Sequence, residues 1–289
     1  MSTPAITLND GHIIPPIAFG TGTALYAKEC TALVLDALET GYRSLDAAQI
    51  YANSQSIGDA LKQWNGKRDD VYVLTKWGKR DGEGGNDPRA VLEIELKKLG
   101  VDYVDMYLIH SPLVPEDLQK AWAQMEEIKK SGLARSVGVS NFREEDILEI
   151  SKTWSHAPAV NQIEYNPYNF HAPNMERLTA LMKQHNIKIQ CYGPLNSVHR
   201  VTGGPVDPVA DKIAKERGCT PAQVLLLWAS QYGGGTVVTT SRNKQRQAEQ
   251  LAAFSQPPLS AEEVSAIAQA GRGKFHRQFM KEVWDLAKA

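Results

Sequence analysis

Residues 103–110 read Tyr-Val-Asp-Met-Tyr-Leu-Ile-His, a short apolar run that ends on a polar side chain. Two earlier stretches have the same form: residues 42–46, Tyr-Arg-Ser-Leu-Asp, and residues 71–76, Val-Tyr-Val-Leu-Thr-Lys. Short runs rich in β-branched and aromatic residues are typical of buried β-strands. Four more such runs are found at residues 135–140, 159–164, 188–192 and 236–239. The sequence therefore predicts at least seven strands.

Helical patterns separate these strands. Apolar residues recur near the helical period in residues 91–99, 118–128, 174–184 and 221–231, and Ser260-Ala-Glu-Glu opens a last helix as a capping box. Strands that alternate with helices form a parallel sheet through right-handed crossovers. The expected fold is therefore α/β, a (β/α)8 TIM barrel with an N-terminal β-hairpin over residues 7–13.

An eight-stranded barrel requires one strand beyond the seven predicted above, and residues 253–254 are the best candidate for it. A doubly wound open sheet is the rival architecture, but Gly20-Thr-Gly22 lacks the third glycine of a dinucleotide-binding turn. Since no linker interrupts the pattern, we expect one domain over residues 1–289. Glycine and polar residues predict long loops at residues 78–87 and 194–208.

Composition narrows the class of partner. Lys plus Arg is 32 and Asp plus Glu is 33, a net charge of −1, whereas nucleic acids and anionic membranes call for a basic excess. Three cysteines without a Cys-x-x-Cys pair predict neither a disulfide framework nor a zinc module. The first residues do not resemble a signal peptide, and no apolar stretch is long enough to span a bilayer. We expect a cytoplasmic monomer that acts on a small molecule.

Polar residues at the strand ends predict the chemistry, because active sites of parallel barrels lie at the carboxyl ends of the strands. Three predicted strands end in Asp46, Lys76 and His110, and Tyr51 follows Asp46 by five residues. An ammonium lowers the pKa of a nearby phenol, a carboxylate can position that ammonium, and an imidazole can orient a carbonyl oxygen. Each residue alone has an ordinary structural explanation; together they predict proton transfer.

The sequence gives less support to a metal site or to a serine or cysteine nucleophile. The histidines lack metal-ligand spacing, so a metal hydrolase is not expected and no metal is assigned. Ser140 is not in a Gly-x-Ser-x-Gly elbow, and Cys191 is expected to be a packed residue rather than a nucleophile.

Motifs along nearly the whole chain resemble the aldo-keto reductase superfamily. They include Gly41-Tyr-Arg-Ser-Leu-Asp-Ala-Ala, Leu74-Thr-Lys-Trp, Tyr107-Leu-Ile-His, Val137-Gly-Val-Ser-Asn-Phe, Val160-Asn-Gln-Ile-Glu-Tyr-Asn-Pro and Tyr192-Gly-Pro-Leu. The resemblance implies an NADPH-dependent reductase of aldehyde or ketone carbonyls that has no separate dinucleotide-binding domain. It also implies that Tyr51 is the proton donor, that Lys76 and Asp46 tune it, and that His110 orients the substrate.

The resemblance further implies a cofactor site. Polar side chains would hold the nicotinamide carboxamide, an aromatic ring would stack on the nicotinamide, and residues 195–197 would meet the pyrophosphate. The implied residues are Thr21, Ser140, Asn141, Gln162, Tyr192, Leu195 and Ser197.

Two segments depart from the common family pattern. Thr240 replaces the lysine expected near the 2′-phosphate, but Ser241, Arg242 and Arg246 remain available for NADPH, with Glu249 and Gln250 for the adenine. The Gly20-Thr-Gly-Thr and Val238-Thr-Thr-Ser segments are similar to fungal reductases of α-keto amides, ketolactones and conjugated polyketones. Tyr26, Trp77 and the tail beyond Arg272 are the expected substrate walls.

Two functions from other classes stay open on the sequence. One is a non-catalytic NADPH-binding regulatory subunit on the same fold. The other is an unrelated barrel enzyme that forms a Schiff base on Lys76.

Overall fold

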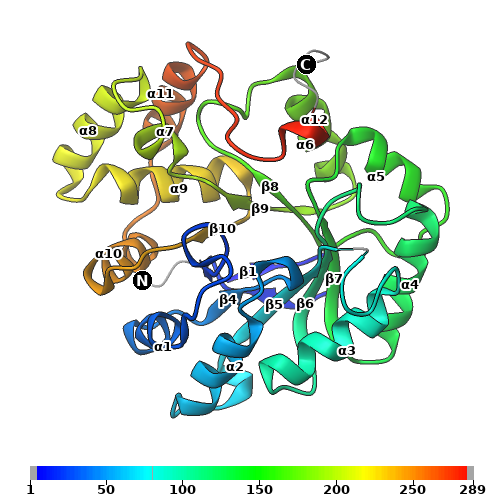
Figure 1. Ribbon diagram of the computed structural model, residues 1–289. Coiled ribbons are helices and arrows are strands. Elements are labelled where there is room, and N and C mark those ends of the chain that lie inside the picture. The colour runs from blue at the N-terminus through cyan, green and yellow to red at the C-terminus, as the bar shows by residue number, and fades with distance from the viewer. Residues whose placement is uncertain (1–4, 80, 285–289) are drawn as a thin grey trace.

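Eight parallel strands form a closed barrel in the computed structural model, which describes residues 5–79 and 81–284 (Figure 1). Neighbours in the barrel follow chain order, and the last strand pairs with the first. The strands are β3 (Ile17–Gly20), β4 (Ser44–Asp46), β5 (Tyr72–Trp77), β6 (Val104–Ile109), β7 (Ala134–Ser140), β8 (Val160–Glu164), β9 (Lys188–Tyr192) and β10 (Thr236–Thr239). The predicted (β/α)8 barrel is confirmed.

Helices surround the barrel and connect its strands (Figure 1). They are α1 (Thr31–Thr40), α2 (Ser54–Gln63), α3 (Pro88–Leu99), α4 (Leu118–Lys130), α5 (Glu144–Ser151), α6 (Pro173–Gln184), α7 (Asn196–His199), α8 (Val206–Arg217), α9 (Pro221–Gly233), α10 (Lys244–Ala252), α11 (Ala261–Gly271) and α12 (Lys281–Trp284). Single turns of 3-10 helix are η1 (Thr23–Leu25), η2 (Gln49–Tyr51), η3 (Arg68–Asp70) and η4 (Ala253–Ser255).

Local sequence accounts for several helix boundaries. Asp87 caps α3 by accepting hydrogen bonds from the next turn, and Gly100 ends that helix in the left-handed conformation. Thr220 opens α9 with a capping box and a proline at the first helical position. The capping box predicted at Ser260 is present at the start of α11.

The predicted N-terminal hairpin is also present. The strands β1 (Ile6–Thr7) and β2 (Ile13–Ile14) pair antiparallel, and the turn between them contains Gly11 at φ 86°. Asp-Gly suits this turn because glycine adopts positive φ without strain.

Three details of the predicted pattern are wrong. The remaining barrel strand is β3, whereas residues 253–254 lie in the 3-10 turn η4, where Ala253 and Phe254 are apolar because they pack in the core. The predicted loop over residues 194–208 contains α7 and the first residues of α8. The helix opened by Ser260 is followed by the short helix α12.

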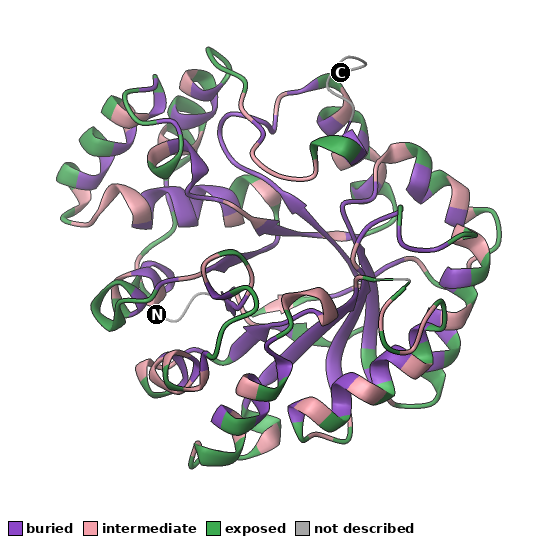
Figure 2. Ribbon diagram, viewed as in Figure 1, coloured by how far each residue is buried: buried purple, intermediate pink, exposed green. Residues whose placement is uncertain are grey.

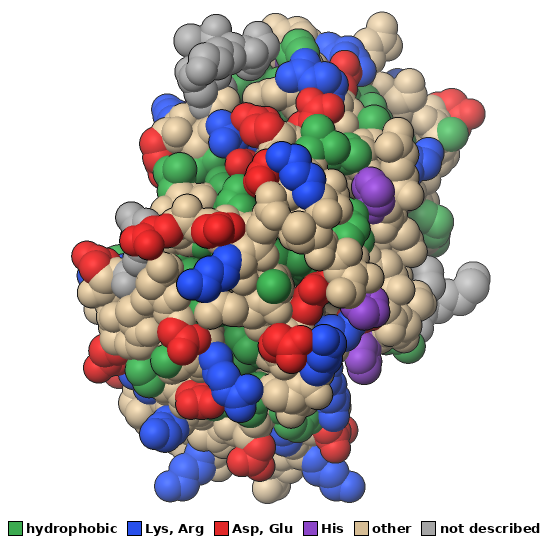
Figure 3. Space-filling model, turned by 90° about the vertical axis from the view of Figure 1, so that its right-hand side faces the viewer, with side chains coloured by type: hydrophobic (Ala, Val, Ile, Leu, Met, Phe, Trp, Pro, Cys, Tyr) green, Lys and Arg blue, Asp and Glu red, His purple; other side chains and the backbone are tan. Residues whose placement is uncertain are grey.

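The barrel strands are largely buried, and the helices expose mainly their outer faces (Figure 2). The face in Figure 3 carries basic and acidic side chains intermixed, as the near-zero net charge predicts. Among the helices of the described residues, none combines the length and apolar character that a bilayer-spanning segment needs.

Candidate active site

A pocket of about 430 Å³ opens at the carboxyl ends of the strands. It contains all the strand-end residues predicted to carry chemistry except Lys76, which lies behind Tyr51 and Asp46. The lining residues are Gly20, Gly22, Thr23, Tyr26, Asp46, Ile50, Tyr51, His110, Asn141, Gln162, Tyr192, Gly193, Pro194, Leu195, Asn196, His199, Arg200, Val238, Thr239, Thr240, Gln250, Phe279 and Met280.

The register of β4 and β5 brings Asp46 and Lys76 together. Asp46 pairs with Leu74, so Lys76 lies two residues further along β5 and on the same face. Its Nζ donates to Oδ1 and Oδ2 of Asp46 at 2.8 and 2.9 Å and to the carbonyl of Ala47 at 2.9 Å. The Lys76 side chain is fully buried, so the ion pair holds a positive charge at a fixed place behind the pocket.

Tyr51 extends this buried chain into the pocket. It ends η2, and Nζ of Lys76 is 3.4 Å from its Oη and 4.9 Å from the centre of its ring. A Cβ on Gly22 would be only 2.8 Å from Cζ of Tyr51, so the second glycine of Gly20-Thr-Gly22 makes room for the phenol. The hydroxyl is thus fixed at the pocket surface beside a cation.

The net effect on the phenol differs from the expected lowering of its pKa. Burial raises the pKa of Tyr51 well above its ordinary value, and the carboxylate of Asp46 acts in the same direction. Burial also lowers the pKa of Lys76, although Asp46 opposes this. Tyr51 is therefore a protonated phenol at neutral pH, as a proton donor must be.

His110 follows β6 directly and packs against Tyr51 in the pocket lining. The two rings meet edge to face with centroids 5.5 Å apart. Burial and the nearby Lys76 ammonium lower the pKa of His110 well below its usual value, so the imidazole is neutral at pH 7. A neutral imidazole can donate one hydrogen bond to a carbonyl oxygen without competing for the proton of the phenol.

Gln162 and its neighbours form the floor of the pocket on β7, β8 and β9. The Gln162 Nε2 donates to Asp46 Oδ1 at 2.6 Å and to Gln190 Oε1 at 2.7 Å. Asn141 donates to the carbonyl of His110 at 2.9 Å and accepts from the hydroxyl of Tyr192 at 2.7 Å. These hydrogen bonds join the predicted cofactor residues to the predicted catalytic residues.

The structure places the remaining predicted residues of this end near the pocket, but not all of them line it. Leu195 lines the pocket, whereas Thr21, Ser140 and Ser197 are buried behind its surface. Thr21 donates to the carbonyl of Asp46 at 2.9 Å, and Ser140 donates to the carbonyl of Gln162 at 2.8 Å. The hydroxyl of Ser197 is buried without a hydrogen-bond partner among the described residues.

The segment after β10 brings the predicted adenosine-end residues to the other side of the pocket. Gln250 lines the pocket and accepts a hydrogen bond from Tyr42 at 3.4 Å. Arg246 approaches the hydroxyl of Ser241 at 3.4 Å. Arg242 and Arg246 are exposed, and Glu249 is half-buried and bonded to Gln245 at 3.2 Å.

Of the two aromatic residues predicted as substrate walls, only Tyr26 lines the pocket, and it is 51% exposed. The prediction for Trp77 is wrong, because its side chain is 1% exposed and packs in the hydrophobic core. Successive side chains of a strand point to opposite faces, so Trp77 points away from the side on which Lys76 meets Asp46.

Several lining residues were not singled out by the strand-end pattern. Phe279 and Met280 fall within the tail that was expected to form a wall, and Asn196 falls within residues 195–197, whereas His199 and Arg200 fall within a stretch predicted only to be a long loop. The glycine-rich composition of that loop was the available signal.

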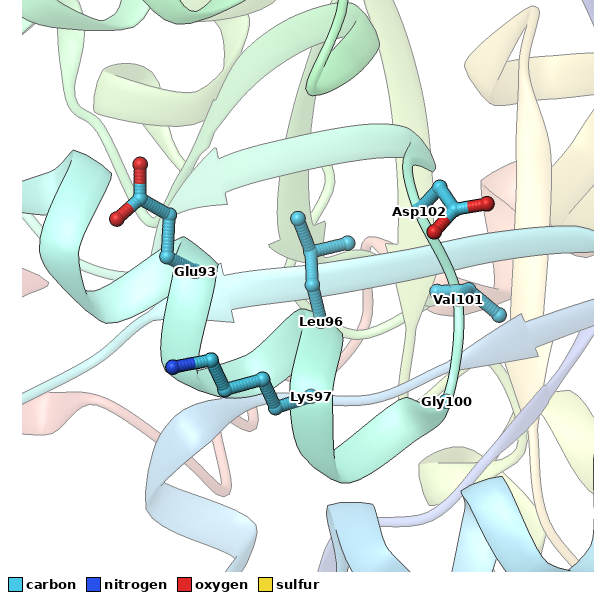
Figure 4. Close-up of a pocket in the computed structure, with 6 residues that line it drawn as sticks. All are labelled: Glu93, Leu96, Lys97, Gly100, Val101 and Asp102. Carbon is cyan, nitrogen blue, oxygen red and sulfur yellow. The ribbon is translucent and has the colours of Figure 1, made fainter.

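A second hollow lies at the amino ends of the strands, where α3 leads into β6. It measures about 460 Å³. Figure 4 shows Glu93, Leu96 and Lys97 on the last turns of α3 and Asp102 on the segment that follows. These surface residues offer no counterpart to the buried Asp46–Lys76–Tyr51 chain, so the candidate active site is the pocket at the carboxyl ends.

Comparison with known proteins identifies relatives over almost the whole chain. The model of the Aldo/keto reductase family matches residues 16–272. The NADPH-dependent alpha-keto amide reductase of Saccharomyces cerevisiae is 34% identical, with 92% of this chain and 90% of the relative covered. The NAD/NADP-dependent indole-3-acetaldehyde reductase of Schizosaccharomyces pombe is 33% identical, with 94% of this chain and 97% of the relative covered.

A comparison with solved structures identifies the same family. The crystal structure of a Bombyx mori aldo-keto reductase in complex with NADP superimposes with a TM-score of 0.84 at 32% identity, and covers 99% of this chain and 98% of that one.

Proposed function

Since the chain belongs to the aldo/keto reductase family, we propose that it is an NADPH-dependent reductase that converts aldehyde or ketone carbonyls to alcohols. The observation that carries the proposal is the buried Asp46–Lys76–Tyr51 chain, which ends at a phenol on the pocket surface opposite a neutral His110. This arrangement can deliver a proton to a carbonyl oxygen inside a site that is partly shielded from water.

The residues divide the work as follows. When bound, the reduced nicotinamide supplies the hydride that the carbonyl carbon accepts. Tyr51 donates its proton to the carbonyl oxygen, and the Lys76 ammonium, 3.4 Å away, stabilises the phenolate that remains. Asp46 holds Lys76 in place, and His110 orients the carbonyl oxygen by a hydrogen bond.

The pocket fits a nicotinamide cofactor. Asn141 and Gln162 provide amide groups on the pocket lining that match a carboxamide, and Tyr192 provides a ring beside them. The hydroxyl of Ser140 lies behind them and accepts a hydrogen bond from Asn141 at 3.0 Å. The hydroxyls of Ser197 and Thr240 are buried without a hydrogen-bond partner among the described residues. Thr240 lines the pocket, so its hydroxyl can bond to a cofactor, whereas Ser197 lies behind the pocket surface.

We propose that residues 195–197 meet the pyrophosphate, with Thr21 near the nicotinamide and Glu249 and Gln250 at the adenine. Ser241, Arg242 and Arg246 would hold the 2′-phosphate, because guanidinium groups bind phosphate through paired, charge-assisted hydrogen bonds. The exposure of both arginines leaves them free to turn toward a phosphate.

The proposed substrates are carbonyl compounds such as aldehydes, α-keto esters, α-keto amides, ketolactones and diketones. The similarity to the yeast alpha-keto amide reductase supports the activated ketones, and the similarity to the indole-3-acetaldehyde reductase supports aldehydes. Tyr26, Phe279 and Met280 give the pocket the apolar walls that such compounds need.

The geometry of Lys76 disfavours Schiff-base chemistry. Its nitrogen is fully buried and is bonded to Asp46 and to the carbonyl of Ala47, so it is not free to attack a substrate carbonyl. A non-catalytic regulatory role is disfavoured by the complete proton-donor chain.

The test is the oxidation of NADPH by wild-type protein and by Tyr51→Phe with ethyl benzoylformate, an α-keto ester. We expect Tyr51→Phe to lose about 10²- to 10⁴-fold or more of the rate, the usual contribution of a general acid, and to keep its affinity for NADPH. The control is Tyr232→Phe, the same change at a tyrosine that stacks on Trp228 outside the pocket. Wild-type turnover by Tyr51→Phe would exclude Tyr51 as the proton donor.

We also propose that residues 1–289 form a single domain and that the protein is a monomer in the cytoplasm. One cooperative unfolding transition and a mass of 31.9 kDa by light scattering would support the first two statements.

A further inference from the structure

Glu164 is a buried carboxylate that the proposed reaction does not use. It ends β8 within the Gln-Ile-Glu motif and is fully buried. Its Oε1 accepts from the side-chain amides of Asn196 at 3.0 Å and Asn166 at 3.2 Å. The backbone N–H of Gln278 donates to both oxygens at 3.0 Å, and that of Phe279 donates to Oε2 at 2.8 Å.

The two backbone donors belong to the C-terminal segment that completes the pocket, residues 278–280, here called the strap. After α11 the chain crosses to the end of β8 (Figure 1), and the strap places Phe279 and Met280 in the pocket wall. The Phe279 ring packs on the edge of Tyr192 with centroids 6.0 Å apart. Met280 has φ 54°, a left-handed conformation that few residues other than glycine adopt, so the strap needs an anchor to keep this shape.

A buried arginine precedes the strap. Arg277, just before the strap, is 2% exposed, and its guanidinium lies 4.2 Å from the centre of the Trp284 ring in α12. Burial lowers the pKa of Arg277, and the nearby carboxylate of Glu164 opposes that shift. The backbone hydrogen bonds to Glu164 therefore come from the strap, and the charge of Glu164 acts on Arg277 just before it.

We propose that Glu164 is a positioning residue that fixes the strap over the substrate end of the pocket, so that Phe279 and Met280 are in place before a substrate binds. The inference rests on the proposed carbonyl reduction for its effect on KM, whereas the anchoring of the strap can be measured without turnover. Through Asn196 the same carboxylate also holds the first residue of α7, at the proposed cofactor end of the pocket.

The decisive variant is Glu164→Gln. A glutamine has nearly the same shape, but one of its two terminal atoms is an NH₂ group that donates and cannot accept. Because both oxygens of Glu164 accept hydrogen bonds, either orientation of the amide sets its NH₂ group against an N–H donor. Glu126→Gln is the matched control, because Glu126 is a buried glutamate that accepts from two consecutive backbone groups, Ser155 and His156, at 2.7 Å each, away from the pocket.

Hydrogen exchange tests the anchor directly. In Glu164→Gln the amides of Gln278 and Phe279 should exchange at least about tenfold faster than in wild type, the equivalent of one lost charge-assisted hydrogen bond. In Glu126→Gln they should exchange at the wild-type rate. Unchanged protection of the strap in Glu164→Gln would overturn the proposal. If this variant does not fold, Glu164→Asp, which withdraws the carboxylate by one methylene, takes its place with the same expected result.

Kinetics with ethyl benzoylformate and NADPH test the consequence. Glu164→Gln should raise KM at least about tenfold while kcat stays within about threefold, since the proton-donor chain is untouched. Phe279→Ala should raise KM as well, and the double variant should be little worse than Glu164→Gln alone, because both changes remove the same wall. A fall in kcat alone, or additive effects on KM, would refute a role through Phe279. A wild-type protein that reduces no carbonyl would refute the proposed function, and hydrogen exchange would still decide the role of Glu164.

Discussion

Replacing Lys76 by Met should destabilise the fold strongly, in addition to impairing turnover. Lys76 donates three hydrogen bonds of 2.8–2.9 Å to Asp46 and Ala47; its side chain is fully buried, and that of Asp46 is 4% exposed. Methionine has nearly the same length and no charge. The substitution leaves a buried carboxylate with Gln162 as its neighbouring donor.

The expected loss follows from this burial. Removing one partner of a buried ion pair typically costs about 3–5 kcal/mol of unfolding free energy, because the other charge stays uncompensated. At about 2–4 °C per kcal/mol, Tm should fall by about 6–20 °C. In the double variant Lys76→Met/Asp46→Asn both charges are gone, so most of the lost stability should return. Lys244→Met, which breaks exposed ion pairs with Asp36 and Glu39, should cost far less.

The assay is equilibrium unfolding in urea, followed by tryptophan fluorescence and extrapolated to zero denaturant. A loss below about 1 kcal/mol, within the range of surface pairs, would show that water reaches this site and that the ion pair is not truly buried. A double variant no more stable than Lys76→Met would refute the explanation by an uncompensated carboxylate.

Three further changes test other parts of the site. His110 is held neutral in the folded protein, whereas in the unfolded chain it takes up a proton near pH 6.5. Below that pH the unfolding free energy of the wild type should therefore fall by about 1.4 kcal/mol per pH unit more than that of His110→Gln. The measurement is urea unfolding at pH 5.5 and 7. Equal pH slopes would contradict the neutral imidazole. In fluorescence titrations Arg246→Ala should weaken the binding of NADPH about tenfold and that of NADH hardly at all, because only NADPH carries the 2′-phosphate. Equal losses of affinity for the two cofactors would assign Arg246 to another role. Trp77→Ala should cost about 3–5 kcal/mol of unfolding free energy with KM unchanged, and a raised KM would restore Trp77 as a pocket wall.

Much of the barrel could be predicted because its signals are local. Seven strands lie in short segments that contain apolar residues and end in a polar or aromatic side chain, and the helices between them show periodicity and caps that depend on neighbouring residues only. The remaining strand, β3, is as long as β10 but ends in glycine, so it lacks the polar side chain that marks the ends of the strands that were predicted. Ala253 and Phe254 were mistaken for it because burial under helices and burial in a strand select the same apolar residues.

The candidate catalytic residues could also be predicted, since Asp46, Lys76 and His110 mark the ends of consecutive strands and parallel strands end on one rim. What these neighbours do to each other could not. The sequence pattern favoured a lowered pKa for Tyr51 beside an ammonium, whereas burial raises it. Desolvation depends on how deeply the folded molecule buries a group, and the spacing of residues along the chain does not indicate this burial.

By itself, then, the sequence determined the order of strands and helices, the rim on which the polar residues meet and the resemblance to the aldo-keto reductases. Only the tertiary structure decided that Trp77 packs in the core, that His199 and Arg200 line the pocket, and that Glu164 holds the strap. The physical reason is distance along the chain. Strand periodicity and capping act over a few residues, whereas Glu164 meets Phe279 across 115 residues, through a contact that exists only once the barrel has closed.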